Sequence, residues 1–339
     1  MRKSANDALL VADIGGTNAR FGVWYQDELL FEQVLRCSDY PGPAAAAGQY
    51  LTLLRANAVT SALPKPRAAA FAIAGPLLDD RVALTNNGWD FSAAATRRAL
   101  DLKRLIFLND FTALALSVPQ LKVAERYQVG GAAPLAEAAV AVLGPGTGLG
   151  VSGLLRARKK WLALQGEGGH ATLPPVDARE MAVVTALHRV HSHVSAERVL
   201  CGDGLALLYR TLADIDGVPN VEPLEAGEIT QRALAAKAQG QANDRCLETV
   251  SLFCGWLGNV AGNLALTLGA RGGVYIGGGI VPRFGEYFAA SPFRQRFEAK
   301  GRFKVFLAPI PVYVITAKYP ALIGCVQAFT HESPRLEAG

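Results

Sequence analysis

The sequence predicts an α/β fold built from two domains, on the basis of its length, its composition and a repeated pattern. At 339 residues the chain is long for a single hydrophobic core, and a composition with 50% hydrophobic and 19% charged residues is typical of a globular protein. A strand, a glycine-rich turn and a second strand are indicated at Leu9–Val23 and again at Ala139–Leu155. The repeat indicates two related halves, each of which offers one loop to a shared cleft.

The first of these hairpins reads LLVADIGGTNARFGV. Two short strands folded about Gly15 and Gly16 would direct the Asp13 carboxylate and the N–H groups of the turn at one point, which suits a phosphate bound to Mg²⁺. For a single string of this kind, an ordinary surface hairpin with an acid at its corner is the alternative. The repeat of the pattern favours a phosphate site.

The second hairpin, AVAVLGPGTGLGVSGLL, has a turn around Thr147 that contains Gly144, Gly146, Gly148 and Gly150. Neither hairpin has the G-x-x-x-x-G-K-[ST] pattern of a P-loop, and neither has G-x-G-x-x-G between a strand and a helix. The sequence therefore favours two matching phosphate loops over the common nucleotide-binding folds.

The other elements of the first half follow from apolar runs and from helix and turn signals. They are a third strand of an antiparallel meander at 29–37, a helix at Pro43–Ala58, a buried strand at Arg67–Gly75, a turn at Asn86–Gly88, a helix that begins after Ser92, and a strand that runs directly into a helix at 102–116. Pro119 breaks this pattern, and we place the first domain boundary near it.

The second half is mostly helical from Asp177–Val190 to Leu268. It then gives a strand before the glycine triplet in GGVYIGGGIVPRF and a last strand at Ile310–Thr316. An apolar-faced helix at Tyr319–Glu332 is expected to return and pack on the first domain. The predicted domains are 1–120 plus 317–339, the smaller, and 121–316, the larger.

Composition and charge limit the partners. The formal net charge is +5, without a block of Lys and Arg interleaved with aromatic residues, so we expect an anionic small substrate and no nucleic acid. The five scattered cysteines favour reduced thiols in the cytoplasm, and no apolar run approaches about 18 residues, so no membrane partner is expected. The spacing of His188, His191 and His193 does not place all three on one helix face, which disfavours a metal cluster.

Asn109 and Asp110 stand where the most apolar strand of the first half meets a helix. The carboxyl ends of strands line the ligand crevice in sheets covered by helices, and a carboxylate there can take the proton of an attacking hydroxyl. The alternative, equally weighted from position alone, is that Asp110 only caps the helix.

Two further strings carry polar or glycine residues suited to a ligand. GEGGH presents Glu167 and His170, a carboxylate and an imidazole of the kind that distinguishes sugar hydroxyls, with a plain flexible loop as the alternative. Glu197, near a helix start, reads first as an acid that matches the helix dipole. Three consecutive glycines after GGVYI allow the backbone to approach a flat or anionic group closely.

Eight strings together resemble the bacterial glucokinase family, ATP-dependent glucose kinases with the hexokinase/actin-like ATPase (ribonuclease H-like) fold. They are ADIGGTNARF, TNNGWDFS, FLNDFTALAL, GPGTGLGVS, GEGGHATLPP, HVSAERVLCGDGL, NLAL and GGVYIGGGIVPRF, and they extend over about 9–328. The resemblance implies two α/β domains around a deep cleft that holds glucose. No cysteine follows His170 in ATLPPVDARE, so the zinc motif of the related repressor/open-reading-frame/kinase family is not expected.

The resemblance also implies roles for individual residues. Asp110 is the implied catalytic base, and the implied sugar ligands are Asn109, Asp110, Glu167, His170 and Glu197. The implied phosphate and ATP contacts are Ala12, Asp13, Ile14, Gly15, Gly16 and Thr17 in the first loop, Gly146, Thr147 and Gly148 in the second, and Gly277, Gly278 and Gly279 in the triplet. Asp13 is expected to place Mg²⁺ through water.

The expected reaction is transfer of the γ-phosphoryl group of ATP to the C6 hydroxyl of glucose, giving glucose 6-phosphate and ADP, the first step of glycolysis. A kinase for another hexose and a sugar-binding regulator without turnover are the alternatives. The expected partners are therefore glucose and ATP, and a homodimer is left open.

Overall fold

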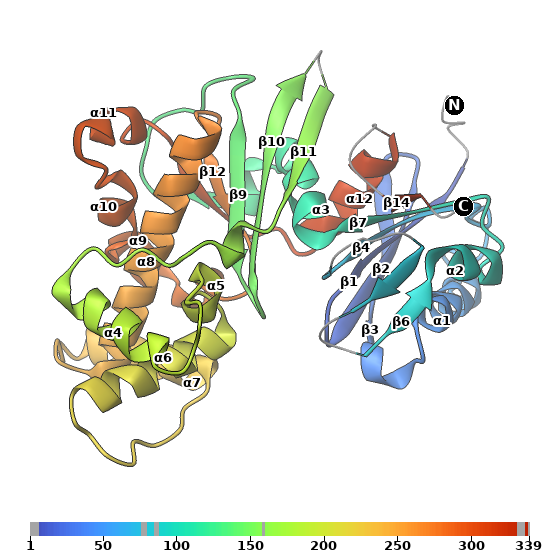
Figure 1. The fold of residues 1–339 in the computed structure, drawn as a ribbon. Coiled ribbons are helices and arrows are strands. Elements are labelled where there is room, and N and C mark those ends of the chain that lie inside the picture. The colour runs from blue at the N-terminus through green and yellow to red at the C-terminus, as the bar shows by residue number, and fades with distance from the viewer. Residues whose placement is uncertain (1–6, 76–79, 85–87, 158–159, 331–335, 338–339) are drawn as a thin grey trace. The chain divides into compact units, whose positions relative to one another are not determined.

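The computed structural model describes residues 7–75, 80–84, 88–157, 160–330 and 336–337, and these form two compact units (Figure 1). The first unit comprises Met1–Leu121, Leu154–Gln165 and Ala317–Gly339. The second comprises Lys122–Gly153 and Gly166–Thr316.

The first unit contains a six-stranded mixed sheet. Its strands, in spatial order, are β14 (Leu336–Glu337), β7 (Arg104–Asn109), β4 (Ala68–Ile73), β1 (Leu9–Ile14), β2 (Asn18–Tyr25) and β3 (Glu28–Arg36). β1 pairs in parallel with β4 and β4 with β7, whereas β1, β2 and β3 form an antiparallel meander. The predicted first hairpin and third strand are confirmed.

The helices of the first unit pack on this sheet and around it. They are α1 (Pro43–Ala56), α2 (Ala93–Ala99), α3 (Asp110–Ser117) and α12 (Pro320–Thr330), with a 3₁₀ turn at Val118–Gln120. α12 packs against α3, β1 and β4. The helix crossing is close, because a Cβ on Gly324 would lie 1.7 Å from the carbonyl oxygen of Ala113. The predicted end of this helix at Glu332 lies outside the described residues.

A second six-stranded sheet contains the strands of the second unit together with residues 154–165, which group with the first. In spatial order its strands are β11 (Lys160–Gly166), β10 (Leu149–Ala157), β9 (Val140–Pro145), β12 (Val274–Ile276), β13 (Val312–Ile315) and β8 (Arg126–Gln128). β12 pairs in parallel with both β9 and β13. The predicted second hairpin is confirmed as β9 and β10, which turn at 146–148.

The second unit contains a series of helices, of which α8 is the longest. They are α4 (Ala178–His188), α5 (Ala196–Val199), α6 (Gly202–Ile215), α7 (Ala226–Ala238), α8 (Arg245–Leu268), α9 (Glu286–Ala290), α10 (Phe293–Glu298) and α11 (Lys304–Leu307). α8 is long and apolar enough to cross a membrane by length and composition, but 67% of its most apolar 18-residue window is buried inside the protein. It packs against α6, α7 and α10 and buries Phe253 and Trp256, so it acts as the core helix of this unit.

The structure differs from the sequence prediction in several features. A short ribbon of β5 (Arg81–Ala83) and β6 (Asp90–Ser92) and the edge strand β14 were not expected, because elements of two or three residues carry no periodic signal. The turn predicted at 86–88 begins at Asn86 and Asn87, which lie outside the described residues. Residues 154–165, assigned by the sequence to the second domain, group with the first unit.

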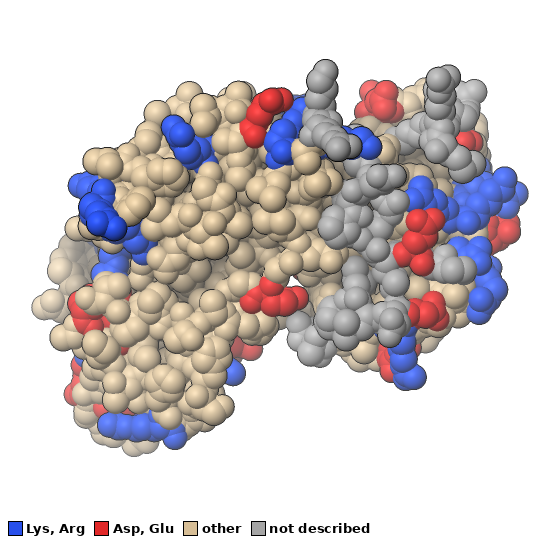
Figure 2. All heavy atoms as spheres, turned by 45° about the horizontal axis from the view of Figure 1, so that its top comes forward, with Lys and Arg blue, Asp and Glu red and all other residues tan. Residues whose placement is uncertain are grey.

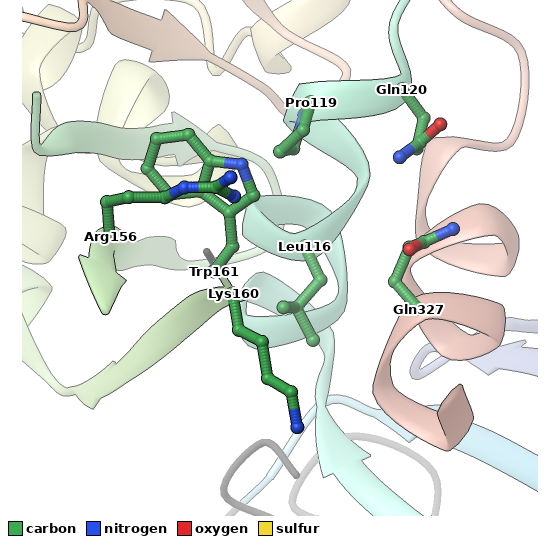
Figure 3. A pocket seen from close by; sticks show the side chains of 7 residues that line it. All are labelled: Leu116, Pro119, Gln120, Arg156, Lys160, Trp161 and Gln327. Atoms are coloured by element: carbon green, nitrogen blue, oxygen red, sulfur yellow. The ribbon is translucent and has the colours of Figure 1, made fainter. Parts of the chain in front are cut away.

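Residues 154–165 and other parts of the first unit line a common pocket. Arg156, Lys160 and Trp161 line a cavity of about 210 Å³ together with residues of α3, α12 and the 3₁₀ turn, namely Leu116, Pro119, Gln120 and Gln327 (Figure 3). The guanidinium of Arg156 stacks over the Trp161 ring at 5.1 Å from its centroid. None of the predicted site residues lines this cavity.

Candidate active site

The first unit brings its predicted site residues to one edge of its sheet. Ile14, Ile73 and Asn109 are in register at the carboxyl ends of the parallel strands β1, β4 and β7. The glycine turn that follows Ile14 and the helix that begins at Asp110 therefore leave the sheet at the same level. This edge is where helix-covered parallel sheets bind ligands.

The first glycine turn is compact and is held by hydrogen bonds within it and from two cysteine side chains. Gly15 donates its N–H to the carbonyl oxygen of Asn18 over 3.0 Å. Two thiols contact the turn and the strand before it: the Sγ of Cys37 donates to the carbonyl oxygen of Gly15 and the Sγ of Cys325 to that of Ala12, each at 3.4 Å. Both cysteines are buried. A turn held in this way can present its backbone in a fixed arrangement.

Asp13 lies at the base of this turn and is paired with Arg20. The Nη1 of Arg20 donates to Oδ2 of Asp13 over 3.1 Å, and the Asp13 side chain is 20% exposed. Burial raises the pKa of Asp13, while the charge and hydrogen bond of Arg20 act to lower it. Arg20 was missed by the sequence reasoning, although the hairpin register places it directly opposite Asp13.

Asp110 is the first residue of α3, and its neighbour is the helix cap. The Asn109 side chain accepts hydrogen bonds from the N–H groups of Phe111 at 2.9 Å and Thr112 at 3.1 Å. This corrects the alternative that Asp110 serves only as a cap, because Asn109 has that role. The Asp110 carboxylate also accepts from Phe111, at 2.8 Å, and lies at the positive end of the helix.

In the second unit, the turn at 146–148 is fixed by backbone contacts. Gly146 donates its N–H to the carbonyl oxygen of Gly148 over 2.7 Å and accepts from Gly202, the first residue of α6, over 3.0 Å. The glycine triplet packs on the strand that precedes the turn, since a Cβ on Gly144 would lie 2.4 Å from the backbone of Gly277. Two of the predicted ATP-binding strings therefore meet.

The predicted sugar residues of the second unit lie beside the same turn. Glu167 and His170 flank the 3₁₀ turn Gly168–His170 and are exposed. Its backbone packs on β10, because a Cβ on Gly169 would lie 2.1 Å from the carbonyl oxygen of Leu149. Oε1 of Glu197 lies 3.8 Å from Nδ1 of His170, which brings a carboxylate and an imidazole together.

Glu197 reaches this position through local pairing of two segments. The N–H of Ala196 donates to the carbonyl oxygen of Ala171 over 2.8 Å, and Thr172 and Ser195 form an isolated bridge. The Glu197 carboxylate accepts from the N–H of Leu149 rather than from its own helix, at 2.8 Å. The reading of Glu197 as an acid that matches a helix dipole is thus incomplete.

Two glycine turns also provide hydrogen-bond donors for an anion. Within the part of the chain that the structure describes, the N–H groups of Gly16, Thr17, Thr147 and Gly148 are not among the donors of the backbone hydrogen bonds found in turns and loops. Backbone N–H groups in tight turns bind phosphate oxygens. Each unit therefore carries one potential phosphate loop.

Asp13, the residue predicted to place Mg²⁺, has a side chain that is 20% exposed, next to the first glycine turn. Among the described residues, no group of three or more His, Cys, Asp or Glu side chains could hold a metal ion by itself. Mg²⁺ is commonly held by one or two carboxylates, substrate phosphates and water, and a single partly exposed carboxylate beside a phosphate loop is compatible with that pattern.

On the face drawn in Figure 2, basic and acidic side chains are interspersed. In the first unit several charged side chains are paired, such as Lys65 and Arg67 with Asp101, and Arg81 with Asp90. In these pairs the positive charge of each Lys or Arg side chain is balanced by a neighbouring Asp carboxylate.

Comparison with known proteins gives similar sequences over nearly the whole chain. A family model described as Glucokinase matches residues 10–332. The chain is 50% identical over 321 residues to the glucokinase of Aromatoleum aromaticum, covering 94% of this chain and 93% of that protein. It is 49% identical over 327 residues to a glucokinase of Neisseria meningitidis serogroup C, with 96% of each covered.

A longer relative is also similar. The bifunctional protein glk of Paraburkholderia xenovorans is 47% identical over 336 residues, which cover 99% of this chain but 50% of that protein. The chain thus spans about half the length of this relative.

Solved structures confirm the predicted hexokinase/actin-like fold class. A glucokinase from an Antarctic psychrotroph superposes with a TM-score of 0.82 at 34% identity, over 96% of this chain and 99% of that one. A ROK family glucokinase from Streptomyces griseus, solved with glucose and AMPPNP, gives a TM-score of 0.60 at 18% identity, over 95% and 98% of the two chains. At that identity the second likeness concerns the fold alone.

Proposed function

The chain belongs to the glucokinase family of ATP-dependent glucose kinases, and from this membership we propose which residues perform the reaction. Asp110 is the general base for the C6 hydroxyl of glucose. The observation that carries this proposal is the junction of β7 and α3, where Asn109 is the N-cap and Asp110, the first residue of the helix, stands at the carboxyl edge of the parallel strands, where such sheets bind ligands.

In the proposed step, the C6 oxygen of glucose forms a bond to the γ-phosphorus of ATP. The bond between that phosphorus and the β,γ-bridging oxygen breaks, and ADP leaves with the electron pair. Asp110 takes the hydroxyl proton, which makes the oxygen a better nucleophile as the bond forms. The products are glucose 6-phosphate and ADP.

The two glycine turns hold the phosphates in this proposal. Gly15, Gly16 and Thr17 form the first loop, after Ala12, Asp13 and Ile14, and Gly146, Thr147 and Gly148 form the second. Their N–H donors support the assignment. Gly277, Gly278 and Gly279 line the adenosine side, where the absence of side chains permits close approach.

Asp13 would hold Mg²⁺ through water. When bound, Mg²⁺ supplies charge neutralisation of the phosphate oxygens. The paired Arg20 keeps Asp13 oriented before the ion arrives.

Glu167, His170, Glu197 and Asn109 contact the sugar hydroxyls. Their mixture of carboxylates, imidazole and amide offers both donors and acceptors, which hydroxyl groups need. We place the reaction in the cytoplasm, as the first step of glycolysis; the five buried cysteines, which form no disulfide in the described chain, are compatible with a reducing compartment.

A coupled assay of ADP release tests the function. At fixed MgATP, glucose is expected to give the highest kcat/KM in a panel of hexoses that includes mannose and fructose. Binding of glucose without ADP release would instead identify a sugar-binding regulator. A higher kcat/KM for another hexose would contradict glucose as the preferred substrate.

A further inference from the structure

We propose that Glu197 fastens the second phosphate loop, Gly146–Gly148, and thereby couples sugar binding to nucleotide binding. The proposal rests on the proposed function, in which Glu197 is a sugar ligand and this loop receives phosphate. It assigns the two carboxylate oxygens to different partners, Oε2 to the loop and Oε1 to the sugar.

The contact on the loop side is direct. Leu149, which follows the loop, donates its N–H to Oε2 of Glu197 over 2.8 Å and so joins the start of β10 to α5. Gly148 leaves space for this carboxylate, because a Cβ there would lie 2.5 Å from Oε2. A side chain at 148 and the observed position of Glu197 are therefore incompatible.

The contact on the sugar side uses the other oxygen. Oε1 lies 3.8 Å from Nδ1 of His170, and the two side chains are 33% and 61% exposed. The backbone bond from Ala196 to Ala171 fixes the spacing between the segments that carry them. A sugar hydroxyl can therefore reach Oε1 while Oε2 stays on the loop.

Coupling follows because one side chain serves both ligands. A hydroxyl that donates to Oε1 restricts the rotamers of Glu197 and so orders the acceptor of the Leu149 N–H as well. A nucleotide that binds the ordered loop then loses less conformational entropy. By thermodynamic linkage, nucleotide tightens sugar binding by the same factor.

The opposite end of the loop is anchored without Glu197. Gly202 donates to Gly146, and Gly277 packs on Gly144. These are backbone contacts that a substitution at Glu197 does not remove. A Glu197→Ala chain should therefore fold. Only the Gly148 end of the loop should become more mobile, because the bond from Leu149 to Oε2 is lost.

Calorimetry on the full chain tests the coupling, with glucose and AMPPNP·Mg²⁺ titrated alone and each in the presence of the other. The wild type is expected to bind AMPPNP about fivefold or more tightly with glucose present, in the usual range for coupled sites. Glu197→Ala should weaken AMPPNP binding even without glucose and bring the coupling factor close to 1. His170→Ala, the matched control at a sugar ligand that does not touch the loop, should weaken glucose but leave AMPPNP affinity without glucose unchanged.

A second pair of variants approaches the contact from the loop. Gly148→Ala pushes on Oε2 and should weaken glucose binding measured without nucleotide. Gly202→Ala lies beside the same turn, but its Cβ would make only an ordinary contact, 3.7 Å from the carbonyl oxygen of Gly146, so it should leave glucose binding unchanged. This pair decides the question if Glu197→Ala fails to fold.

The outcomes separate this proposal from the proposed function. If Glu197→Ala weakens glucose but leaves AMPPNP affinity and the coupling factor unchanged, the fastening role is wrong and the sugar role stands. If it weakens AMPPNP but not glucose, the sugar role of Glu197 is wrong, and the coupling fails with it. Equal effects of Gly148→Ala and Gly202→Ala on glucose would also overturn the proposal.

Discussion

Asp13 and Arg20 face each other across the first hairpin, and the Arg20 guanidinium donates a 3.1 Å hydrogen bond to the Asp13 carboxylate. The pair lies directly below the first phosphate loop. Burial favours the neutral acid, whereas Arg20 favours the carboxylate that a magnesium ion requires. The charge state of Asp13 therefore depends on its cross-strand neighbour.

Replacing Arg20 should move the acid limb of the pH–activity profile. In Arg20→Met the cation that lowers the pKa of Asp13 is lost, so this pKa rises further and the carboxylate is protonated at higher pH. The fall of kcat/KM for MgATP on acidification should then begin at a higher pH than in the wild type. Arg20→Lys, which keeps a positive charge, should lie between the two, and identical profiles for wild type and Arg20→Met would refute the link.

Removing the proposed base should separate binding from turnover. Asp110→Asn is expected to bind glucose, while kcat falls by about 10²–10⁴-fold. Titration calorimetry gives the affinity, and the coupled ADP assay gives the rate. Near-normal turnover would rule out Asp110 as the base.

Breaking an ion-pair cluster of the second unit should lower the stability of that unit at neutral pH. Arg179 bridges Asp216 and Glu248 through bonds of 2.7–3.1 Å, and it lowers the pKa of Asp216. A lowered carboxyl pKa contributes stability that is present above the ordinary value and is lost as pH falls through the lowered one.

Arg179→Met should therefore reduce the free energy of unfolding by about 0.5–1 kcal/mol near neutral pH, a modest figure because the pair is about one-third exposed. The difference from the wild type should shrink as the pH is lowered below the ordinary range of an Asp carboxyl. Urea denaturation across pH measures this. A difference that grew on acidification would contradict the assignment.

Two glycines inside helices should respond in opposite directions to alanine. Gly324→Ala places a Cβ against the backbone of Ala113, which cannot move aside as a side-chain end could, and should destabilise the first unit by about 1–3 kcal/mol. Gly48→Ala in α1 meets no atom within 4 Å and should stabilise by about 0.5–1 kcal/mol. Thermal melting of both variants decides the matter, and a stable Gly324→Ala would indicate that α12 and α3 separate easily.

The sequence predicted most of the elements because their signals are local. The apolar run at Leu9 and the glycines after Ile14 specify a strand and a turn without reference to the remainder of the chain. β14 could not be found in this way, since two residues become a strand only by pairing with β7, more than 200 residues away.

Among the site residues, too, those with a local sequence signal could be predicted, and those positioned by distant contacts could not. Asp110 could be proposed from its place between an apolar strand and a helix. The position of Glu197 could not, because it depends on pairing between Ala171 and Ala196 and on a bond to Leu149, 48 residues away. Arg20 lay within reach of sequence reasoning, because a hairpin that turns after Ile14 pairs Asp13 with Arg20.

The two-residue strand β14 also bears on how the protein behaves in a concentrated solution. It pairs with Ile106 and Phe107 of β7, and Arg104 on β7 holds it through two hydrogen bonds to Glu337, at 2.8 and 3.1 Å. Without β14, β7 would be an edge strand with unpaired N–H and C=O groups, and its sequence RLIFLN is strongly apolar. Such a strand is a template for pairing with other chains, so these few residues protect the sheet from aggregation.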